Sequence, residues 1–311
     1  MLNELQKVAA AMDQLLAAEK LPAQVCPQYL MDAVLAYPLR KGKRLRPALA
    51  YWFCGLVGGQ PEKAAHAGLA IELYHNWTLI HDDIIDDDNL RRGGPTCHVM
   101  LGEAVAGLPA ASDTMKAAFG RNMAILAGDI LHGWAINLLA RAGEDGVDPG
   151  VVNMLVRRMT GWVTPELISG EALDVEFEGR VELSEDEIEN MLLMKTGVLL
   201  QFAAEAGVMI GKNSADTGDD QVRKAAEFAA SAGMAFQMQD DILGVYGDEE
   251  RLGKPICSDI REGKQTLLLV KGLQMAAGTA EHEQLSAMIG KLDLDAKDIE
   301  KARDILQSSG A

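Results

Sequence analysis

The sequence predicts an all-α protein, and three features support this fold class. Apolar residues recur at three- and four-residue spacings, as they do on one face of a helix. Residues that favour helix are common, whereas only 10 of the 311 residues are prolines. No segment alternates apolar and polar residues convincingly, as a half-buried strand would. We expect one all-helical domain over residues 1–311.

The predicted helices are long and follow one another closely along the chain. Residues 64–87 are apolar nearly all round before an acidic end, which predicts a buried helix. Ser184, with Glu187 three residues later, predicts a capped helix start. A loop is expected within 103–120 and a charged, glycine-rich flap at 247–263. The expected helices cover 2–19, 48–58, 64–87, 121–141, 151–178, 184–208 and 221–245, with two or three more within 265–307.

Composition argues against several classes of protein. The net charge of −17 is unsuited to a nucleic-acid partner, because phosphate backbones attract basic surfaces. The first 20 residues are acidic and amphipathic, unlike a secretory signal, and no uninterrupted apolar run has the length of a membrane span. The cysteines are scattered, without the spacing of a zinc site or a disulfide framework: Cys26, Cys54, Cys97 and Cys257. We expect a cytoplasmic protein without a membrane span.

An acidic cluster, Asp82-Asp83-Ile84-Ile85-Asp86-Asp87-Asp88, ends the helix at 64–87. Asp82 and Asp86 lie one helical turn apart on one face, and Asp83 is rotated off it. Two such carboxylates suit a hard cation such as Mg²⁺, which takes oxygen ligands. The alternative is an acidic helix end in solvent, but acids at a helix C-terminus oppose the macrodipole unless a cation compensates. We favour the metal site.

A second acidic pair, Asp240-Asp241, also follows an apolar helix. Alone it is equally compatible with a solvated helix end. Together with the first cluster it predicts two acidic helix ends that face each other across a cavity. Since carboxylates repel an anionic substrate, divalent ions bridged by a diphosphate would be required between them.

Basic residues gather in short runs within this acidic chain. The run from Lys41 to Pro47 contains four cations, and a loop there would present Lys43 and Arg46 to phosphate oxygens. Arg91 and Arg92 follow the first acidic cluster and would either pair with its carboxylates or bind phosphate, which we favour. Taken singly, the more distant lysines would face solvent: Lys195, Lys254 and Lys264.

In this order the motifs resemble trans-type polyprenyl diphosphate synthases, most closely the archaeal-type short-chain geranylgeranyl and farnesyl diphosphate synthases. The resemblance runs from about Lys41 to Thr266. It implies an isoprenoid-synthase-type bundle of long antiparallel helices around a central cavity, and a homodimer. The motifs are Gly42-Lys43-Arg44-Leu45-Arg46-Pro47, His75, the cluster at Asp82 to Asp86 with Arg91-Arg92-Gly93, Gly128-Asp129, Lys195-Thr196-Gly197 and Phe236-Gln237-Met238-Gln239-Asp240-Asp241.

The resemblance implies roles for individual residues. Asp82, Asp86 and Asp240 would hold Mg²⁺, expected as three ions with Mn²⁺ as a substitute, on an allylic diphosphate. The allylic diphosphate would be bound by Arg91, Lys195, Thr196, Gln237, Lys254 and Lys264, of which Arg91, Lys195 and Lys254 are the catalytic candidates. Isopentenyl diphosphate would be bound without metal by Lys43, Arg46, His75 and Arg92. For His75, the alternative is a core histidine on an apolar helix.

The implied reaction is a short-chain condensation. Mg²⁺ and the lysines would stabilise the leaving diphosphate, the isopentenyl double bond would attack the allylic cation, and the released diphosphate would take the proton. Dimethylallyl, geranyl and farnesyl diphosphates would be the starters. Trp77 and Thr78, just before Asp82, would form the floor that limits chain length, with the C20 product geranylgeranyl diphosphate expected ahead of C15 farnesyl diphosphate.

The sequence departs from the family pattern at four places. Gly244 stands where a third aspartate is usual, although archaeal-type members tolerate glycine, and Asp248 one turn on could compensate. Lys41 replaces a common glycine, Glu171 replaces a common glutamine, and the stretch from Glu103 to Arg121 is longer than usual.

Three alternatives remain open at this point. A terpene cyclase shares the metal-diphosphate chemistry, but it would not need a second diphosphate site, which is predicted here from Lys43, Arg46, His75 and Arg92. A non-catalytic or regulatory subunit of a heteromeric synthase is supported mainly by Gly244. A helical acidic scaffold would leave the spacing of both acidic clusters unexplained.

Overall fold

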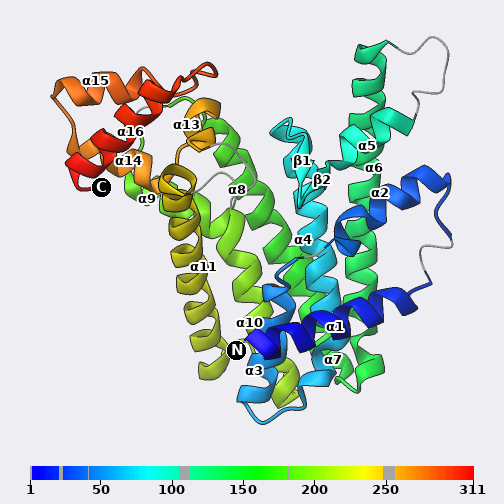
Figure 1. Cartoon of the computed structure of the whole chain (residues 1–311). Coiled ribbons are helices and arrows are strands. Elements are labelled where there is room, and N and C mark those ends of the chain that lie inside the picture. Colours follow the sequence, from blue (N-terminus) through cyan, green and yellow to red (C-terminus); the bar gives the residue numbers. More distant parts are fainter. Residues whose placement is uncertain (1, 21–23, 41, 105–111, 181, 248–255) are drawn as a thin grey trace. The chain divides into compact units, whose positions relative to one another are not determined.

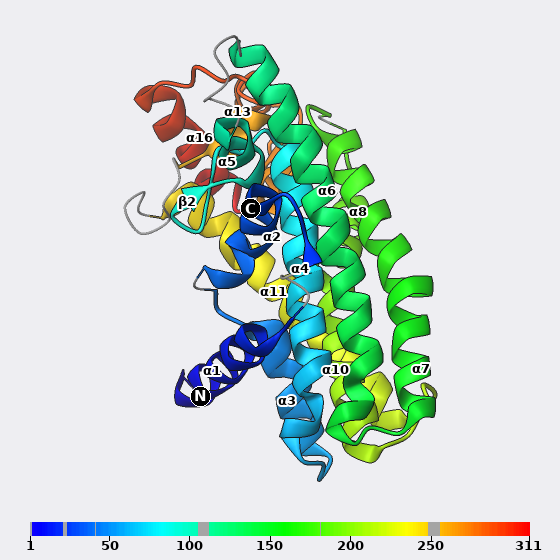
Figure 2. The ribbon, with the colours of Figure 1, turned by 90° about the vertical axis from the view of Figure 1, so that its right-hand side faces the viewer.

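The computed structural model describes residues 2–20, 24–40, 42–104, 112–180, 182–247 and 256–311. This part of the chain is almost entirely helical (Figures 1 and 2), which confirms the predicted all-α class. It divides into two compact units. Unit 1 comprises Met1–Trp162 and Leu199–Glu227, and unit 2 comprises Val163–Val198 and Phe228–Ala311. Assignment of the whole chain to one domain stays a prediction.

Unit 1 is built around α4, which packs along α6 and is also contacted by α3 and α1. As predicted, α4 is largely buried up to its acidic end, because most residues before that end are apolar or small. The elements are α1 (Leu2–Ala18), α2 (Gln28–Leu39), α3 (Leu45–Leu56), the 3₁₀ turn η2 (Pro61–Ala64), α4 (Ala65–Ile85), β1 (Leu90–Arg91), β2 (Gly94–Pro95), α5 (Cys97–Ala104), α6 (Asp113–Ala140), the 3₁₀ turn η3 (Arg141–Asp145), α7 (Pro149–Arg158) and most of α10 (Val198–Lys212).

Glycine allows the helices of unit 1 to approach closely. A Cβ added to Gly128 of α6 would lie 2.2 Å from Nε2 of His81 on α4. One added to Gly207 of α10 would lie 2.4 Å from the backbone oxygen of Ala50 on α3. Because no Cβ occupies either space, the side chains and backbone of the facing helix can fill it.

Unit 2 contains two apolar clusters, one formed mainly by the C-terminal helices and the other around Phe177 and Ile188. Two π-helical turns lie at or near the ends of the first chain segment of unit 2. The turn η4 (Met159–Val163) crosses the boundary with unit 1, and η5 (Leu193–Gly197) joins α9 to α10. The remaining elements are α8 (Thr164–Phe177), α9 (Glu185–Leu192), α11 (Asp220–Tyr246, which begins in unit 1), α13 (Ser258–Glu262), α14 (Leu267–Met275), α15 (Ala280–Ser286) and α16 (Ala296–Ser309).

Several expected boundaries were wrong. Helix α6 begins eight residues before position 121, since the Ser112 hydroxyl accepts a hydrogen bond from the backbone N–H of Met115 and caps the helix. Helices α2 and α5 were not predicted, and Pro38 within α2 disguises it. Residues 90–95 form a two-stranded antiparallel ladder with two residues in each strand. The Ser184–Glu187 capping box is confirmed.

Two helical stretches are long and apolar enough to cross a membrane by length and composition alone. In the stretch Glu185–Lys212, 72% of the most apolar window is buried, as in the core helix of a globular protein. In Asp113–Asp145 the share is 44%, and the exposed side chains of this helix include Ile125 and Leu126.

A buried histidine joins the start of α4 to the 3₁₀ turn η3, which follows α6. Nδ1 of His66 lies 2.8 Å from Oδ1 of Asp145, and the His66 backbone N–H donates to the other carboxylate oxygen at 2.8 Å. Arg141 lies beside the ring and also makes two hydrogen bonds to Glu19 at the end of α1. The hydrogen bond to Asp145 raises the pKa of His66 above its ordinary value.

We expect His66→Gln to lower the free energy of unfolding by about 1–3 kcal/mol near pH 6, since it removes a buried hydrogen-bonding group. A raised folded-state pKa means that this contribution is complete below the unfolded-state pKa of about 6.5 and is lost as pH rises through the folded-state pKa. Urea unfolding of both proteins at pH 6 and pH 8.5 measures this. A difference that stays constant or grows toward pH 8.5 contradicts the role of His66.

Candidate functional site

The end of α4 presents the first acidic cluster as predicted. The backbone N–H of Asp86 donates to the carbonyl oxygen of Asp82 at 2.8 Å, so the two residues are one helical turn apart. Both are partly exposed. Asp82 and Asp86 are therefore positioned as neighbours on one helix face, the arrangement that the sequence predicts for a pair of metal ligands.

Asp83 is rotated off this face and is fully buried. Its carboxylate accepts hydrogen bonds from the hydroxyl of Tyr37 on α2 and from Nε of Arg91, the latter at 2.6 Å. The backbone N–H of Cys97 donates to the Tyr37 oxygen at 3.1 Å. Burial raises the pKa of Asp83 to about 6, against the opposing effect of Arg91. Hydrogen bonds to Asp83 thus connect Arg91 and α2 to α4.

Arg91 pairs with the acidic cluster. Besides Asp83, its guanidinium lies 3.3 Å from the Asp82 carboxylate and 3.1 Å from that of Asp88. The sequence leaves two roles open for Arg91, pairing with carboxylates and binding phosphate. In the structure Arg91 pairs with carboxylates. The predicted contact of Arg91 with an allylic diphosphate stays a prediction.

The basic run before α3 divides into residues with different roles. Arg44, only 6% exposed, is held by Glu72 at 2.7 Å and by the carbonyl oxygen of Pro38, and its φ of 50° lies in the left-handed region. Lys43 is exposed. Arg46 is partly buried, and its buried Nε has no hydrogen-bond partner among the described residues. Arg44 is structural, whereas Arg46 retains capacity to bind an anion.

Arg46, His75 and Arg92 form a cationic cluster in unit 1. Arg92 reaches the Tyr37 backbone oxygen and the Asn76 side-chain oxygen, both at 3.2 Å. A Cβ added to Gly42 would lie only 3.2 Å from the Arg92 guanidinium, so glycine at this position leaves room for the arginine side chain. Four sequence-predicted residues of the isopentenyl diphosphate site thus lie in the same unit, three of them in this cluster: Lys43, Arg46, His75 and Arg92.

Charge repulsion and burial act together on this cluster. Burial lowers the pKa of Arg46 to about 10, with Arg92 acting in the same direction. Burial also lowers the pKa of His75 well below its ordinary value, and the neighbouring arginines lower it further. Both effects favour the neutral form of His75, which is still able to act as a hydrogen-bond donor. An anion placed here would relieve the repulsion among the guanidinium groups.

In unit 2, Lys195 lies between two carboxylates of α8. Its Nζ is 2.9 Å from Glu171 and 2.6 Å from Asp174. Lys195 and Thr196 lie in the π-helical turn η5, which approaches α8 so closely that a Cβ on Gly170 would lie 2.4 Å from the Lys195 backbone nitrogen. Glu171, where the family usually has glutamine, adds a negative charge that Lys195 balances.

The second acidic pair lies near the end of α11. Asp240 is exposed, whereas Asp241 is 5% exposed and accepts a hydrogen bond from the Gln237 side chain at 3.0 Å. Burial raises the pKa of Asp241 to about 6. Its Oδ2 is buried without a hydrogen-bond partner among the described residues. Gln237 therefore supports the acidic pair, and its predicted contact with substrate stays a prediction.

Some predicted residues lie outside the described residues, namely Lys254, Asp248 and Lys41, as does part of the predicted flap. Lys264 is described: its Nζ is 3.9 Å from Glu262, and its backbone N–H donates to the Asp259 carbonyl oxygen at 2.8 Å. The role of Lys264 at a diphosphate stays a prediction.

The residues present fit hard divalent cations. Asp82, Asp86 and Asp240 offer carboxylate oxygen, and the unpartnered Oδ2 of Asp241 is an orphaned acceptor next to Asp240. Within the described part of the chain, no group of three or more His, Cys, Asp or Glu side chains converges enough to hold a metal by itself. Ions bound here would need further oxygen ligands from water or a phosphorylated molecule, as Mg²⁺ commonly does.

Trp77 is buried in an aromatic cluster between α4 and α6. Its ring centroid lies 4.8 Å from that of Tyr74 and 4.5 Å from that of His132 on α6. Neither Trp77 Nε1 nor His132 Nε2 has a hydrogen-bond partner among the described residues. Thr78 donates its hydroxyl to the His75 carbonyl oxygen at 2.8 Å. The position is compatible with both the floor role and a core role, so the floor stays a prediction.

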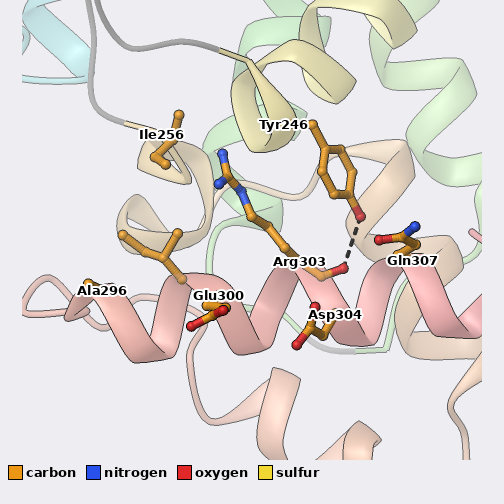
Figure 3. A pocket seen from close by; sticks show the side chains of 8 residues that line it. Tyr246, Ile256, Ala296, Glu300, Arg303, Asp304 and Gln307 are labelled. Carbon is orange, nitrogen blue, oxygen red and sulfur yellow. Dashed lines mark hydrogen bonds between the residues drawn. The ribbon is translucent and has the colours of Figure 1, made fainter.

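A hollow of about 590 Å³ lies elsewhere in unit 2, between the end of α11 and α16 (Figure 3). The hydroxyl of Tyr246 donates to the Arg303 carbonyl oxygen at 3.1 Å at its edge. None of the sequence-predicted site residues lines this hollow.

Sequence reasoning missed the supporting residues Tyr37, Asp174 and Asp259. Tyr37 lies in α2, a helix that Pro27 and Pro38 conceal. Asp174 lies one turn after Gly170 and is close to Glu171, so helical spacing within α8 was the available signal. Asp259 stands in a short polar stretch where no periodicity marks it.

Comparisons with known proteins identify the family. The sequence model of the Polyprenyl synthetase family matches residues 28–306. A geranylgeranyl diphosphate synthase of Saccharolobus solfataricus is 41% identical over 270 residues, which cover 86% of this chain and 73% of that protein. A short chain isoprenyl diphosphate synthase of Methanothermobacter thermautotrophicus is 36% identical over 289 residues, covering 93% and 80%.

Solved structures give the same result. A geranylgeranyl pyrophosphate synthetase from Pyrococcus horikoshii has a TM-score of 0.82 and 32% identity, covering 99% of this chain and 86% of that one. A geranylgeranyl pyrophosphate synthase from Corynebacterium glutamicum, complexed with isoprenyl diphosphate and magnesium, has a TM-score of 0.82 and 27% identity, with coverage of 99% and 87%. The predicted family and enzyme class are confirmed. The chain belongs to the polyprenyl synthetase family and is a prenyltransferase.

Proposed function

We propose that this prenyltransferase condenses isopentenyl diphosphate with dimethylallyl, geranyl and farnesyl diphosphates to make geranylgeranyl diphosphate, with farnesyl diphosphate as the second candidate product. The observation that carries the proposal is the presence, in unit 1, of both an acidic helix end and a cluster of two partly buried arginines with His75. The first suits a metal-bound diphosphate, and the second suits a diphosphate without metal. A reaction that joins two diphosphate substrates needs both.

The cationic cluster would bind isopentenyl diphosphate. The buried Nε of Arg46 is available to donate a hydrogen bond, and Arg92 is close enough to Arg46 to interact with it electrostatically. Neutral His75 would donate one hydrogen bond to a phosphate oxygen without adding to the repulsion. Lys43, exposed at the end of the loop, would contact the outer phosphate.

The acidic helix ends would hold the allylic diphosphate through Mg²⁺, with Asp82 and Asp86 from α4 and Asp240 from α11. When bound, Mg²⁺ supplies the positive charge that stabilises the diphosphate as it leaves. Lys195, Thr196 and Lys254 would add hydrogen bonds and charge to the same group. Asp83 and Tyr37 would keep Arg91 oriented toward it. Bond formation then leaves a proton, which the released diphosphate would accept.

Chain length would be limited by Trp77, with Thr78 beside it. The indole is fixed by Tyr74 and His132, so it forms a rigid wall rather than a mobile one. A growing isoprenoid running along α4 below Asp82 would end at this wall.

The protein is proposed to be soluble, cytoplasmic and homodimeric. Ile125 and Leu126 of α6 expose 44% and 45% of their surface, and a second copy of the chain would cover them. The shared class of the similar proteins supports a soluble enzyme.

The purified protein should elongate each allylic starter with labelled isopentenyl diphosphate and Mg²⁺, and a chelator should abolish the reaction.

We expect Arg46→Gln to raise KM for isopentenyl diphosphate by about 10-fold or more and to leave KM for the allylic partner nearly unchanged. The reason is that a charged hydrogen bond contributes about 1.5–3 kcal/mol. Asp82→Asn should instead lower kcat. The matched control is Arg180→Gln, an exposed arginine of unit 2.

Steady-state kinetics with one substrate varied at a time separates these effects. Cyclisation of a single allylic diphosphate would identify a terpene cyclase. No elongation by the purified chain, with activity restored by a second protein, would identify a partner subunit. An Arg46→Gln enzyme with unchanged KM for isopentenyl diphosphate would contradict the assigned cationic site.

Trp77→Ala should lengthen the main product by one or more C5 units, because removal of the indole opens the end of the cavity. The variant should also lose about 3–5 kcal/mol of stability, so its fold is checked by circular dichroism before the assay. Chromatography of dephosphorylated products measures chain length. Products identical to those of the wild type would show that Trp77 is a core residue and not the floor.

A further inference from the structure

The second acidic cluster lacks the partner that completes the first. Asp82 is followed one helical turn later by Asp86, whereas Asp240 is followed one turn later by Gly244. Gly244 is buried and has an ordinary right-handed backbone conformation, so glycine is not required there by a positive φ. The space beside Gly244 must therefore have another use.

That space is occupied by a carboxylate from another helix. A Cβ added to Gly244 would lie 3.2 Å from Oδ2 of Asp259, the second residue of α13. The backbone N–H of Cys257 donates to the Gly244 carbonyl oxygen at 2.8 Å, which fixes the start of α13 against this turn of α11. Both elements belong to unit 2. The Asp259 carboxylate thus lies in tight contact distance of any side chain at position 244.

A second observation points to a ligand at this place. Asp241, three residues before Gly244 and so on the adjoining part of the helix face, is 95% buried, and its Oδ2 has no hydrogen-bond partner among the described residues. Gln237 holds the other oxygen at 3.0 Å. A buried acceptor without a donor is costly unless a cation or an ordered water satisfies it.

We propose that Asp259 supplies, from α13, the acidic group that position 244 lacks, and that it acts with Asp240 in holding a divalent cation. This inference rests on the proposed function, since that cation is the one bridged by the allylic diphosphate. It differs from compensation by Asp248, which would place the acid further along the chain. Glycine at 244 is then the residue that makes room for Asp259.

Metal binding, measured apart from turnover, tests this proposal. Mn²⁺ is titrated into the full-length protein with inorganic pyrophosphate present, and free Mn²⁺ is followed by electron paramagnetic resonance. Asp259→Asn should weaken Mn²⁺ binding by about 10-fold or more, as loss of a ligand or of a group that orients one does. The double variant Gly244→Asp/Asp259→Ala should recover affinity to within about threefold, because it moves the carboxylate back to α11. Glu189→Gln, an exposed acid of α9, is the matched control.

The outcomes separate this inference from the proposed function. If the wild type binds no Mn²⁺ with pyrophosphate, both are overturned. If Asp240→Asn loses Mn²⁺ binding and Asp259→Asn does not, or if the double variant fails to recover, Asp259 has no metal role while the proposed function stands.

A charge-matched comparison provides a second test. In a chain that also carries Asp259→Ala, Gly244→Asp should bind Mn²⁺ more tightly than Gly244→Asn, which has the same size without the charge. Thermal unfolding verifies that both variants fold. Equal affinities of these two variants would contradict the proposal.

Discussion

The buried carboxylate of Asp83 is the interaction on which the predicted site depends. Asp83 lies inside unit 1 at the end of α4, where a lone charge would be strongly unfavourable. Arg91 and Tyr37 satisfy it, and through them α2, the β1–β2 ladder and the start of α5 are joined to the last turn of α4. Because Asp83 points into the interior, Asp82 and Asp86 are left on a more exposed part of the helix surface. One buried ion pair thus sets both the position of Arg91 and the direction of the candidate metal ligands.

Charge balance explains why cations and carboxylates alternate through the candidate site. Arg91 is held by the acidic cluster, and Lys195 is held by Glu171 and Asp174. A diphosphate with its metal ions could take over these cations without leaving a carboxylate uncompensated. Arg46, His75 and Arg92 differ, because burial and mutual repulsion are only partly offset there by Glu72. The first arrangement suits an anion that arrives with metal, and the second suits an anion that arrives alone.

The fold class and the acidic clusters could be predicted from sequence because both depend on helical spacing. An apolar helix that ends in Asp82, Asp83 and Asp86 fixes which carboxylates share a face, and the structure agrees. Contacts between distant segments could not be predicted in the same way. The spacing of residues does not show that Tyr37 contacts Asp83 or that Asp259 lies beside Gly244. Nor does it show that Arg44 is buried against Glu72 while the Nε of Arg46 has no partner among the described residues. These depend on close packing of segments far apart in the chain, which a one-dimensional pattern does not contain.

The central claim is that Asp82 and Asp86 of α4 and Asp240 of α11 hold metal ions on one shared diphosphate. Crystals grown with Mn²⁺ and inorganic pyrophosphate, with diffraction recorded at the manganese absorption edge, test it directly. The account predicts anomalous peaks next to both acidic clusters, with a single diphosphate contacting the ions of both. Peaks at separate sites without a common diphosphate, or no peak at either cluster, would contradict it.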